Sequence, residues 1–341
     1  MRKRQGNRHR LTVIMPRLGL SLGIVCLMAI TVAGCDGRES RVLHLKLAHS
    51  LDTGHPVHES MEHMSRVLRD ISRGNMQIDI YPSGQLGSER DLIELLQIGS
   101  LAMTKVSASP LEGFAPEMKV FSIPYVFRDQ AHFWQVLEGD IGRELLLSLE
   151  RVRLRGLGYY DAGSRSFYTT SQAVHSPADL QGLKIRVQKS QTSVDMVAAL
   201  GGAATPIAWG ELYTALQQGI VDGAENNLPS FYLSRHYEAS RYFTLDEHTS
   251  VPDVLLISRY IWRGLDSQQQ AWLQQAVNES IVFQRKRWNE ASKQALEAVI
   301  EAGIEIIRPD KTPFRDAVVS MHQSYQGSPV GEILKRINAV P

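Results

Sequence analysis

The segment from residue 43 to residue 81 decides the fold class: Leu43-His-Leu-Lys-Leu-Ala48, a stretch that begins His55-Pro56, and Met76-Gln-Ile-Asp-Ile-Tyr81. The first and last parts alternate apolar and polar residues, which is typical of β-strands. Between them, after a proline that suits the first turn of a helix, apolar residues recur at helical spacing at Val57, Met61, Met64 and Leu68. Strand, helix and strand in this order predict a parallel sheet with crossover helices, and therefore an α/β fold.

The pattern continues along the chain and indicates two lobes of similar construction. Ser88 and Asp91 form a capping pattern for a further helix. Leu96-Gln-Ile-Gly99-Ser-Leu101 and Leu216-Gln-Gln-Gly219-Ile-Val221 each place a helix end and its glycine just before an apolar strand. A body of about 300 residues exceeds one comfortable hydrophobic core, which favours roughly two domains. We interpret residues 152–170 as a crossing from the first lobe to the second.

A long helix is expected near the C-terminus. Asp266 or Ser267 can cap a helix that runs without a break to Ala302, where Gly303 supplies the stop. Apolar residues keep roughly helical spacing throughout this stretch, at Leu273, Val277, Ile281, Trp288, Ala295 and Val299. At 1.5 Å per residue the helix is about 50 Å long, which exceeds one small lobe, so we expect it to lie across both.

The first 34 residues have the three parts of a secretory signal. A basic stretch from Met1 to Arg17 precedes an apolar run, residues 18–30, that is shorter than the ~20 residues of a membrane-spanning helix. The run ends in small residues and a cysteine, Val32-Ala33-Gly34-Cys35, which resembles the lipobox of bacterial lipoproteins. We expect Cys35 to be lipidated and to tether a soluble body to the membrane. A plain signal peptide or an uncleaved anchor is the alternative.

Charge and motif content exclude several classes of function. Six basic residues precede residue 35, where no acid occurs, so the remainder carries 31 basic and 36 acidic residues, a net charge of −5. A mildly acidic protein is not attracted to the phosphates of nucleic acids, so we expect no nucleic-acid partner. The sequence has no nucleophile elbow, phosphate-binding loop or dinucleotide-binding turn, and no pair of cysteines spaced for a metal or redox site. We therefore predict no catalytic residue and no cofactor.

One metal-binding alternative stays open. His58-Glu-Ser-Met-Glu-His63 resembles a zinc-protease helix, but its histidines are five residues apart, which turns the second about 140° away from the first. His44, His49, His55 and His58 nevertheless make this region rich in potential ligands. A solvated helix face with a capping loop explains the same residues without a metal.

Two arginines stand where ligands gather in α/β proteins. Arg186 lies in the apolar strand Gly182-Leu-Lys-Ile-Arg-Val-Gln-Lys-Ser190, and Arg165 follows a Gly-Ser turn. An arginine at the end of a strand can present its planar fork to a carboxylate with two parallel hydrogen bonds. Pairing with a structural Asp or Glu fits the spacing equally well, so the residues alone leave both interpretations open.

Longer motifs resemble the solute receptors of TRAP (tripartite ATP-independent periplasmic) transporters, the DctP-like family. They are Tyr81-Pro-Ser-Gly-Gln-Leu-Gly-Ser-Glu89, Gly182-Leu-Lys-Ile-Arg-Val187, Thr205-Pro-Ile-Ala-Trp-Gly-Glu-Leu-Tyr-Thr-Ala-Leu-Gln-Gln-Gly219 and Val221-Asp-Gly-Ala-Glu-Asn226. The resemblance extends from about residue 43 to 310. It implies a periplasmic-binding-protein-like fold of two α/β lobes joined by a hinge, with the long helix spanning both.

With this resemblance we divide the chain into a signal at 1–34, lobe I at 42–162 plus 252–291, lobe II at 163–251 plus 292–320, and a C-terminal tail at 321–341. The resemblance also implies a periplasmic receptor, not an enzyme, that delivers an organic acid to membrane permease subunits driven by a sodium gradient.

Site residues follow from the resemblance position by position. Arg186 resembles the arginine that clamps the ligand carboxylate, with Arg165 as the second basic contact and Asn226 as an amide donor to the same carboxylate. Trp209 stands where an aromatic residue closes over the ligand. Further polar contacts fall at Glu89, Ser107, Ser50 and Ser190, and His55 or His49 beside them is an additional candidate.

This set of residues suits a sugar acid. A single carboxylate needs the fork of Arg186, hydroxyls need acceptors such as Glu89, and a ring face packs on Trp209. Glu89 would repel the second carboxylate of a C4-dicarboxylate. Two further segments, Lys105-Val-Ser-Ala-Ser-Pro110 and Asp161-Ala-Gly-Ser-Arg-Ser-Phe167, most resemble receptors for hexuronates. We therefore expect D-glucuronate or D-galacturonate.

Four alternatives to a uronate transport receptor remain. They are a receptor for a C4-dicarboxylate or another organic acid, a metal receptor using the histidine-rich loop, a partner that presents its ligand to a sensor kinase, and an enzyme with Glu89 as a base.

Overall fold

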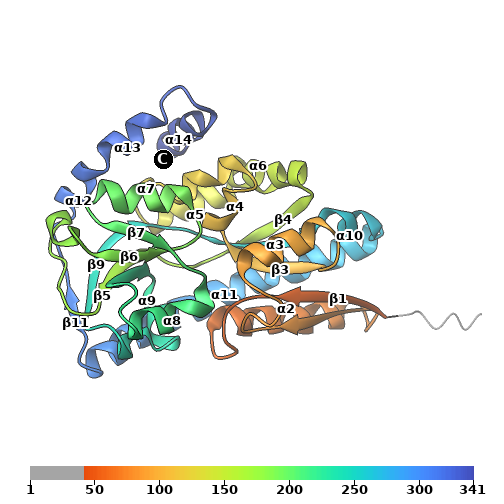
Figure 1. Cartoon of the computed structure of the whole chain (residues 1–341). Helices are drawn as coiled ribbons and strands as arrows, with labels where there is room; N and C mark the ends of the chain where they lie inside the picture. The colour runs from red at the N-terminus through yellow and green to blue at the C-terminus, as the bar shows by residue number, and fades with distance from the viewer. Residues whose placement is uncertain (1–41) are drawn as a thin grey trace, which may run out of the picture. The chain divides into compact units, whose positions relative to one another are not determined.

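The computed structural model describes residues 42–341, whose strands form two separate β-sheets (Figure 1). The first sheet has the strand order β2-β1-β3-β10-β4. Its strands are β1 (Leu43–Ala48), β2 (Met76–Tyr81), β3 (Met103–Ser107), β4 (Leu154–Tyr160) and β10 (Asp253–Ser258). The strands β2, β1 and β3 are parallel, as the segment from residue 43 to 81 predicts, and β10 runs antiparallel to both of its neighbours.

The second sheet has the strand order β11-β9-β5-β8-β6-β7. Its strands are β5 (Arg165–Thr169), β6 (Lys184–Val187), β7 (Ala203–Pro206), β8 (Gly223–Asn226), β9 (Tyr242–Thr249) and β11 (Glu305–Ile307). The strands β7, β6 and β8 are parallel, whereas β5 pairs antiparallel with β8 and with β9. Each sheet thus combines a parallel part with one antiparallel strand, β10 or β5, that the chain inserts after crossing between the sheets.

Each sheet is covered on both faces, which is why its strands are so apolar. Alternate residues of β10 show the two faces: Val254 and Leu256 belong to one buried cluster, and Leu255 and Ile257 to another. The α-helices between and after the strands are α2 (Pro56–Ile71), α3 (Glu89–Gln97), α4 (Ala108–Leu111), α5 (Gln130–Glu138), α6 (Asp140–Ser148), α7 (Gln191–Ala199), α8 (Trp209–Gln217), α9 (Leu228–Leu233) and α10 (Arg259–Gly264). Short 3₁₀ turns are η1 (Pro116–Phe121), η2 (Leu149–Val152), η3 (Pro177–Leu180) and η4 (His236–Glu238).

The helix ends follow local chemistry. His55 caps α2, because its Nδ1 accepts a hydrogen bond from the backbone N–H of Val57 at 3.2 Å, and Pro56 occupies the first turn. Ser88 and Asp91 form a capping box at the start of α3. These caps fix the loop between β1 and α2 and the loop between β2 and α3. Both loops contribute residues to the wall of the cavity described below, together with loops of the second sheet.

The long helix α11 (Ser267–Glu301) is confirmed. Asp266 and Gln269 form its capping box, and Gly303, with a φ of 84°, follows its end. Its 35 residues span about 52 Å at 1.5 Å per residue. It packs on α2 and β4 of the first sheet and on α9 beside the second, so it lies across both (Figure 1).

The C-terminal helices also touch both halves. The helices α12 (Thr312–Ala317) and α13 (Val319–Ser324) lie beside η3 and α7, and Phe314 is buried in a cluster with Val187 of β6. The last helix, α14 (Pro329–Ala339), packs on η1 and α6, where Ile337 is fully buried.

The strands of the first sheet come from residues 43–160 and 253–258, and those of the second from 165–249 and 305–307. The exact lobe boundaries, 42–162 plus 252–291 and 163–251 plus 292–320, stay a prediction. The expected signal at 1–34 and Cys35 lie outside the described residues. Within residues 42–341, no helix is both long enough and apolar enough to span a bilayer.

Candidate ligand-binding site

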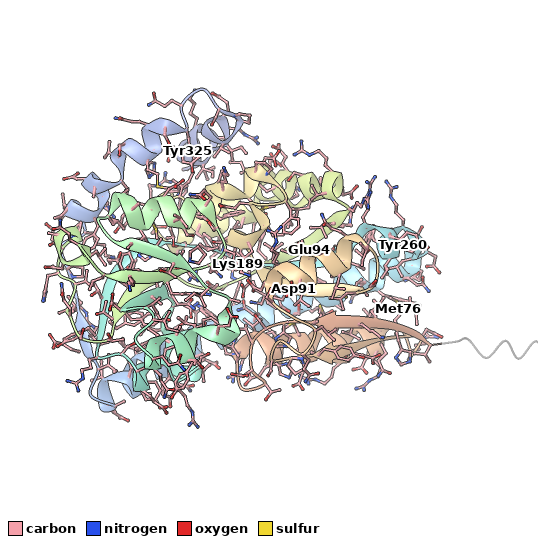
Figure 2. The ribbon with its side chains drawn as sticks, viewed as in Figure 1. Met76, Asp91, Glu94, Lys189, Tyr260 and Tyr325 are labelled. Atoms are coloured by element: carbon pink, nitrogen blue, oxygen red, sulfur yellow. The ribbon has the colours of Figure 1, made fainter. Side chains whose placement is uncertain are left out.

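A cavity of about 400 Å³ lies between loops and strand ends of the two sheets. Ala162 and Val251, which lie on the two chain crossings between the sheets, form part of its wall. Eight predicted site residues line it, namely Ser50, His55, Glu89, Ser107, Arg165, Arg186, Trp209 and Asn226. Asp91 of α3 and Lys189, just beyond β6, line it too and are labelled in Figure 2. Two hydrogen bonds from Ser88, and after them the charge of Lys189, hold the pKa of Asp91 below its ordinary value.

Arg186 reaches this cavity from β6 and is only 2% exposed. Its Nε donates a hydrogen bond to the backbone oxygen of Ile207 at 2.9 Å, while its buried Nη1 has no hydrogen-bond partner among residues 42–341. The guanidinium carbon lies 5.9 Å from the ring centre of Trp209. Burial lowers the pKa of Arg186, because the described part of the chain provides no carboxylate within ion-pair distance to offset it. The side chain thus holds unused, oriented donors beside the cavity.

Arg165, at the start of β5, is in the opposite situation. Its Nε and Nη2 form a buried ion pair with the carboxylate of Glu225, and Nη2 also donates to the backbone oxygen of Glu225 at 2.7 Å. Burial by itself would raise the pKa of Glu225, but Arg165 and His248 outweigh it and lower that pKa to about 2. The two interpretations of the arginines therefore separate: Arg165 has a structural acid as its partner, and Arg186 has none.

Asn226 links Arg165 to the cavity. Its Oδ1 accepts a hydrogen bond from Nη1 of Arg165 at 3.0 Å and another from the backbone N–H of Asn227 at 2.9 Å. With Oδ1 occupied in this way, the amide group of Asn226 is oriented by the protein, and its Nδ2 is the polar atom left for a ligand. Arg186 on β6 and Asn226 at the end of the neighbouring strand β8 line the same cavity. Their joint contact with a ligand carboxylate stays a prediction.

The first sheet and α3 contribute a cluster of three charges, two of them buried and the third, Glu89, partly exposed. Lys105 of β3, which is 3% exposed, lies 3.0 Å from Asp253 and 3.5 Å from Glu89. Glu89 also accepts a hydrogen bond from the backbone N–H of Ser107 at 3.1 Å. Burial raises the pKa of Glu89 even though Lys105 opposes the shift.

Sequence reasoning missed Lys105 and Asp253. The sequence held a signal for both, because each is a charged residue in or at the end of a mostly apolar segment, as Arg186 is.

Trp209 begins α8 and touches both halves of the molecule. It packs against the buried cluster behind the first sheet and against the cluster that contains Leu212 and Phe231 beside the second. Its ring centre lies 5.0 Å from that of His236. One face of a large aromatic ring thus forms part of the cavity wall next to Arg186.

Hydrogen bonds across the cavity connect the two sheets. Ser107 Oγ donates to Oε1 of Gln188 at 3.2 Å, and His55 Nε2 lies 3.3 Å from Ser230 Oγ. Burial, assisted by the charge of Lys105, lowers the pKa of His55 to about 3, so its ring is neutral at ordinary pH.

Two candidates are not among the residues that line the cavity. Ser190 caps α7, where its Oγ accepts a hydrogen bond from the backbone N–H of Ser193 at 3.0 Å. His49 is fully buried and lies 3.0 Å from the ring of His58. No group of three or more His, Cys, Asp or Glu side chains in the described range is arranged to hold a metal ion, so the described residues give the metal-receptor alternative no support.

A sequence profile described as bacterial extracellular solute-binding protein, family 7 (DctP), matches residues 47–328. The chain belongs to this family. Among solved structures, a TRAP periplasmic solute-binding protein from Bradyrhizobium sp. BTAi1, in complex with α/β-D-galacturonate, is 40% identical, with a TM-score of 0.84 over 86% of this chain and 99% of that chain. A TRAP periplasmic solute-binding protein from Pseudomonas putida F1 with bound D-glucuronate is 36% identical, with a TM-score of 0.84 over 87% of this chain and 97% of that chain.

Among curated proteins, the uncharacterized protein YiiZ of Salmonella typhimurium is 36% identical, over 84% of this chain and 88% of its own length. These findings confirm the predicted family and the predicted fold class. The protein is a TRAP solute receptor of a periplasmic family, and such a receptor is not an enzyme.

Proposed function

We propose that this protein captures a hexuronate, D-glucuronate or D-galacturonate, and delivers it to the membrane permease of a TRAP transporter. The proposal rests on one observation above all, the buried guanidinium of Arg186, whose Nη1 has no partner within residues 42–341. A buried charge without a partner is costly, and a cavity that holds one is a candidate binding site for the opposite charge.

The ligand carboxylate is expected between Arg186 and Asn226. A guanidinium offers two parallel donors that match the two oxygens of a carboxylate. The Nδ2 group of Asn226, oriented by the hydrogen bond from Arg165 to its Oδ1, supplies a further donor. In this arrangement Arg165 positions Asn226, and Arg186 carries the main ionic contact.

The rest of the ligand is expected to carry hydroxyl groups and one apolar face. Glu89 and Ser107 line the cavity on the side of the first sheet, and carboxylate and hydroxyl oxygens accept hydrogen bonds from ligand hydroxyls. The ring of Trp209 offers a flat apolar surface for a pyranose. The two similar receptors solved with galacturonate and glucuronate support this ligand class.

Ligand binding is expected to favour the arrangement in which the two sheets approach each other. The carboxylate contacts Arg186 from the second sheet, while the hydroxyl acceptors Glu89 and Ser107 come from the first. Only a conformation that brings both sides to the ligand satisfies all of these groups, and a ligand shifts an equilibrium only through contacts that differ between the states.

Titration calorimetry of the purified receptor with D-glucuronate, D-galacturonate, succinate and D-glucose tests the proposal. We expect both uronates to bind and to raise the melting temperature, because a ligand that binds only the folded state stabilises it. D-glucose lacks the carboxylate and is expected not to bind. A panel in which succinate alone binds would show that the ligand is a dicarboxylate and would overturn the uronate assignment.

We also propose that the receptor is held at the membrane by a lipid on Cys35. The support is the sequence Val32-Ala33-Gly34-Cys35 after an apolar run of signal-peptide length. In cells that make the full chain, the receptor is expected in the membrane fraction, and mass spectrometry of the purified protein is expected to show a lipid on an N-terminal Cys35. A mature protein without a lipid on Cys35 would contradict the lipid anchor.

A further inference from the structure

We infer that Lys105, Glu89 and Asp253 restrict this receptor to acids with a single carboxylate and make it reject the corresponding sugar diacids. The inference rests on the proposed function, because it concerns the far end of an acid whose first carboxylate lies at Arg186. We call these three residues the ion cluster.

The strand register explains how the ion cluster forms. Strands β3 and β10 are antiparallel, with Asp253 opposite Ser107 and Leu255 opposite Lys105. Lys105 and Asp253 are therefore diagonal neighbours on one face of the sheet, within reach of each other for long side chains. Glu89, the first residue of α3, approaches the same ammonium group from the helix.

The ion cluster holds two acids and one base, so it has an excess of one negative charge when both acids are ionised. Lys105 is 3% exposed and is held by two carboxylates, at 3.0 Å and 3.5 Å, so its positive charge is already compensated. Both acids line the cavity. They can accept hydrogen bonds from ligand hydroxyls, but Lys105 has no unbalanced charge left with which to attract a carboxylate.

The opposite sheet has the opposite excess. Arg186 lines the same cavity without an acid partner in the described part of the chain, and Arg165 is balanced by Glu225. The cavity is therefore positive at the end of β6 and negative at β3 and β10. An acid with one carboxylate matches this polarity, whereas a diacid must place its second carboxylate against Glu89 and Asp253.

A matched pair of ligands isolates this effect. D-gluconate and D-glucarate are open-chain six-carbon acids with the same hydroxyl pattern from C2 to C5, and they differ in whether C6 is a CH₂OH group or a carboxylate. Like charges brought together in a buried site weaken binding strongly, so we expect D-glucarate to bind the native receptor at least about 100-fold more weakly than D-gluconate.

Variants of the ion cluster test the cause. Glu89→Gln and Asp253→Asn each remove one negative charge and keep the size of the side chain. Each variant should therefore lower the ratio of the dissociation constant for D-glucarate to that for D-gluconate by about tenfold or more. Glu211→Gln is the matched control, since Glu211 lines the same cavity but is exposed at its rim. The ratio in this control should stay within about twofold of the native value.

The outcomes separate this inference from the proposed function. If the native receptor binds uronates and also binds D-glucarate as tightly as D-gluconate, the role of the ion cluster is wrong and the uronate proposal stands. If both cluster variants retain the native ratio, the role is also wrong, whichever ligand binds best. If the native receptor binds no sugar acid at all in the same titrations, the proposed function fails and this inference with it. The native ratio needs no variant, so a variant that does not fold still leaves a decisive measurement.

Discussion

Arg186 and Lys105 approach the same cavity from different sheets, and both are almost completely buried, at 2% and 3% exposure. Lys105 has two carboxylates within 3.5 Å, and they raise its pKa above the ordinary value even though burial acts in the other direction. Arg186 has no such partner in residues 42–341, and burial lowers its pKa. Burial of a charge alone is therefore not the criterion for a candidate binding residue. The criterion is a buried charge without a counter-charge, because a ligand can supply it.

The same distinction holds within the second sheet, between Arg165 and Arg186. Arg165 has Glu225 as a permanent partner, so its first role is to support the fold and to orient Asn226. The two arginines resemble the same functional pair in sequence, yet substitutions at them should have different main effects.

Arg165→Ala is expected to have the largest effect, and on stability. It leaves Glu225, which is 2% exposed, as a buried carboxylate without its main partner. Breaking a buried pair in this way typically costs about 3–5 kcal/mol in the free energy of unfolding. Chemical denaturation of the ligand-free protein measures the loss. A loss below about 1 kcal/mol would mean that the pair contributes little to the fold.

Arg186→Ala should behave in the reverse manner. We expect the affinity for a uronate to fall by at least about 30-fold, which corresponds to about 2 kcal/mol, because the ligand carboxylate loses its ionic partner. The free energy of unfolding of the ligand-free protein should not fall, since an uncompensated buried charge is removed. Calorimetry and denaturation measure the two quantities.

The control for this prediction is Arg90→Ala. Arg90 also lines the cavity, but it is half exposed and lies 3.1 Å from Glu94. Its removal should change the affinity by less than about threefold. If Arg90→Ala and Arg186→Ala weaken binding equally, general charge attraction and not a specific clamp explains the affinity.

Much of the fold was predictable because local sequence patterns determine where its strands and helices lie. The alternation in residues 43–48 and 76–81 predicted two parallel strands, and Asp266 and Gly303 marked the ends of α11 to within two residues. The antiparallel insertions of β5 and β10 were not predictable in this way. They depend on which distant strand each one meets after the chain crosses between the sheets, and no local period encodes that choice.

The candidate site was predictable only in part, and for a related reason. Arg186, Asn226 and Trp209 each lie in a continuous sequence motif that resembles the family's. Lys105 and Asp253 are 148 positions apart and come together only through the register of β3 and β10. Ser190 shows the opposite case. It follows Arg186 closely in sequence, but its side chain caps α7 and it is not among the residues that line the cavity, so its role stays a prediction.

Two buried histidines with opposite pKa shifts, His55 in the cavity wall and His248 outside it, predict how stability depends on pH. Burial and Lys105 lower the pKa of His55 to about 3, whereas Asp246 and Glu225 outweigh burial and raise the pKa of His248 to about 9. The contribution of His248 is fully present below its unfolded pKa of about 6.5 and is lost as the pH rises to 9. The contribution of neutral His55 is present above about 6.5 and is lost as the pH falls toward 3.

Stability should therefore be greatest near pH 6.5 and decline on both sides, with the alkaline decline on the order of 3 kcal/mol by pH 9. Denaturation curves at several pH values measure it. His248→Gln should flatten the alkaline side and leave the acid side unchanged. His55→Gln should reduce the acid decline without removing it, because burial also lowers the pKa of His49 to about 2 and that of His236 to about 3. An alkaline decline that persists in His248→Gln would assign it to another group.

The smallest predicted effect concerns the hydrogen bond that joins the two sides, from Ser107 on β3 to Gln188 just beyond β6. A neutral hydrogen bond contributes about 0.5–1.5 kcal/mol, so Ser107→Ala should weaken uronate binding by about two- to tenfold. Because the bond joins the two sheets around the ligand, its loss should appear mainly as faster dissociation, with the association rate little changed. Gln188→Ala removes the same bond from the other side. Ser107→Ala also removes a proposed ligand contact, so if the bond is responsible for the effect of Gln188→Ala, the double variant should bind no more weakly than Ser107→Ala alone, since interacting residues are not additive. Fully additive losses would mean that the approach of the two sheets does not depend on this bond.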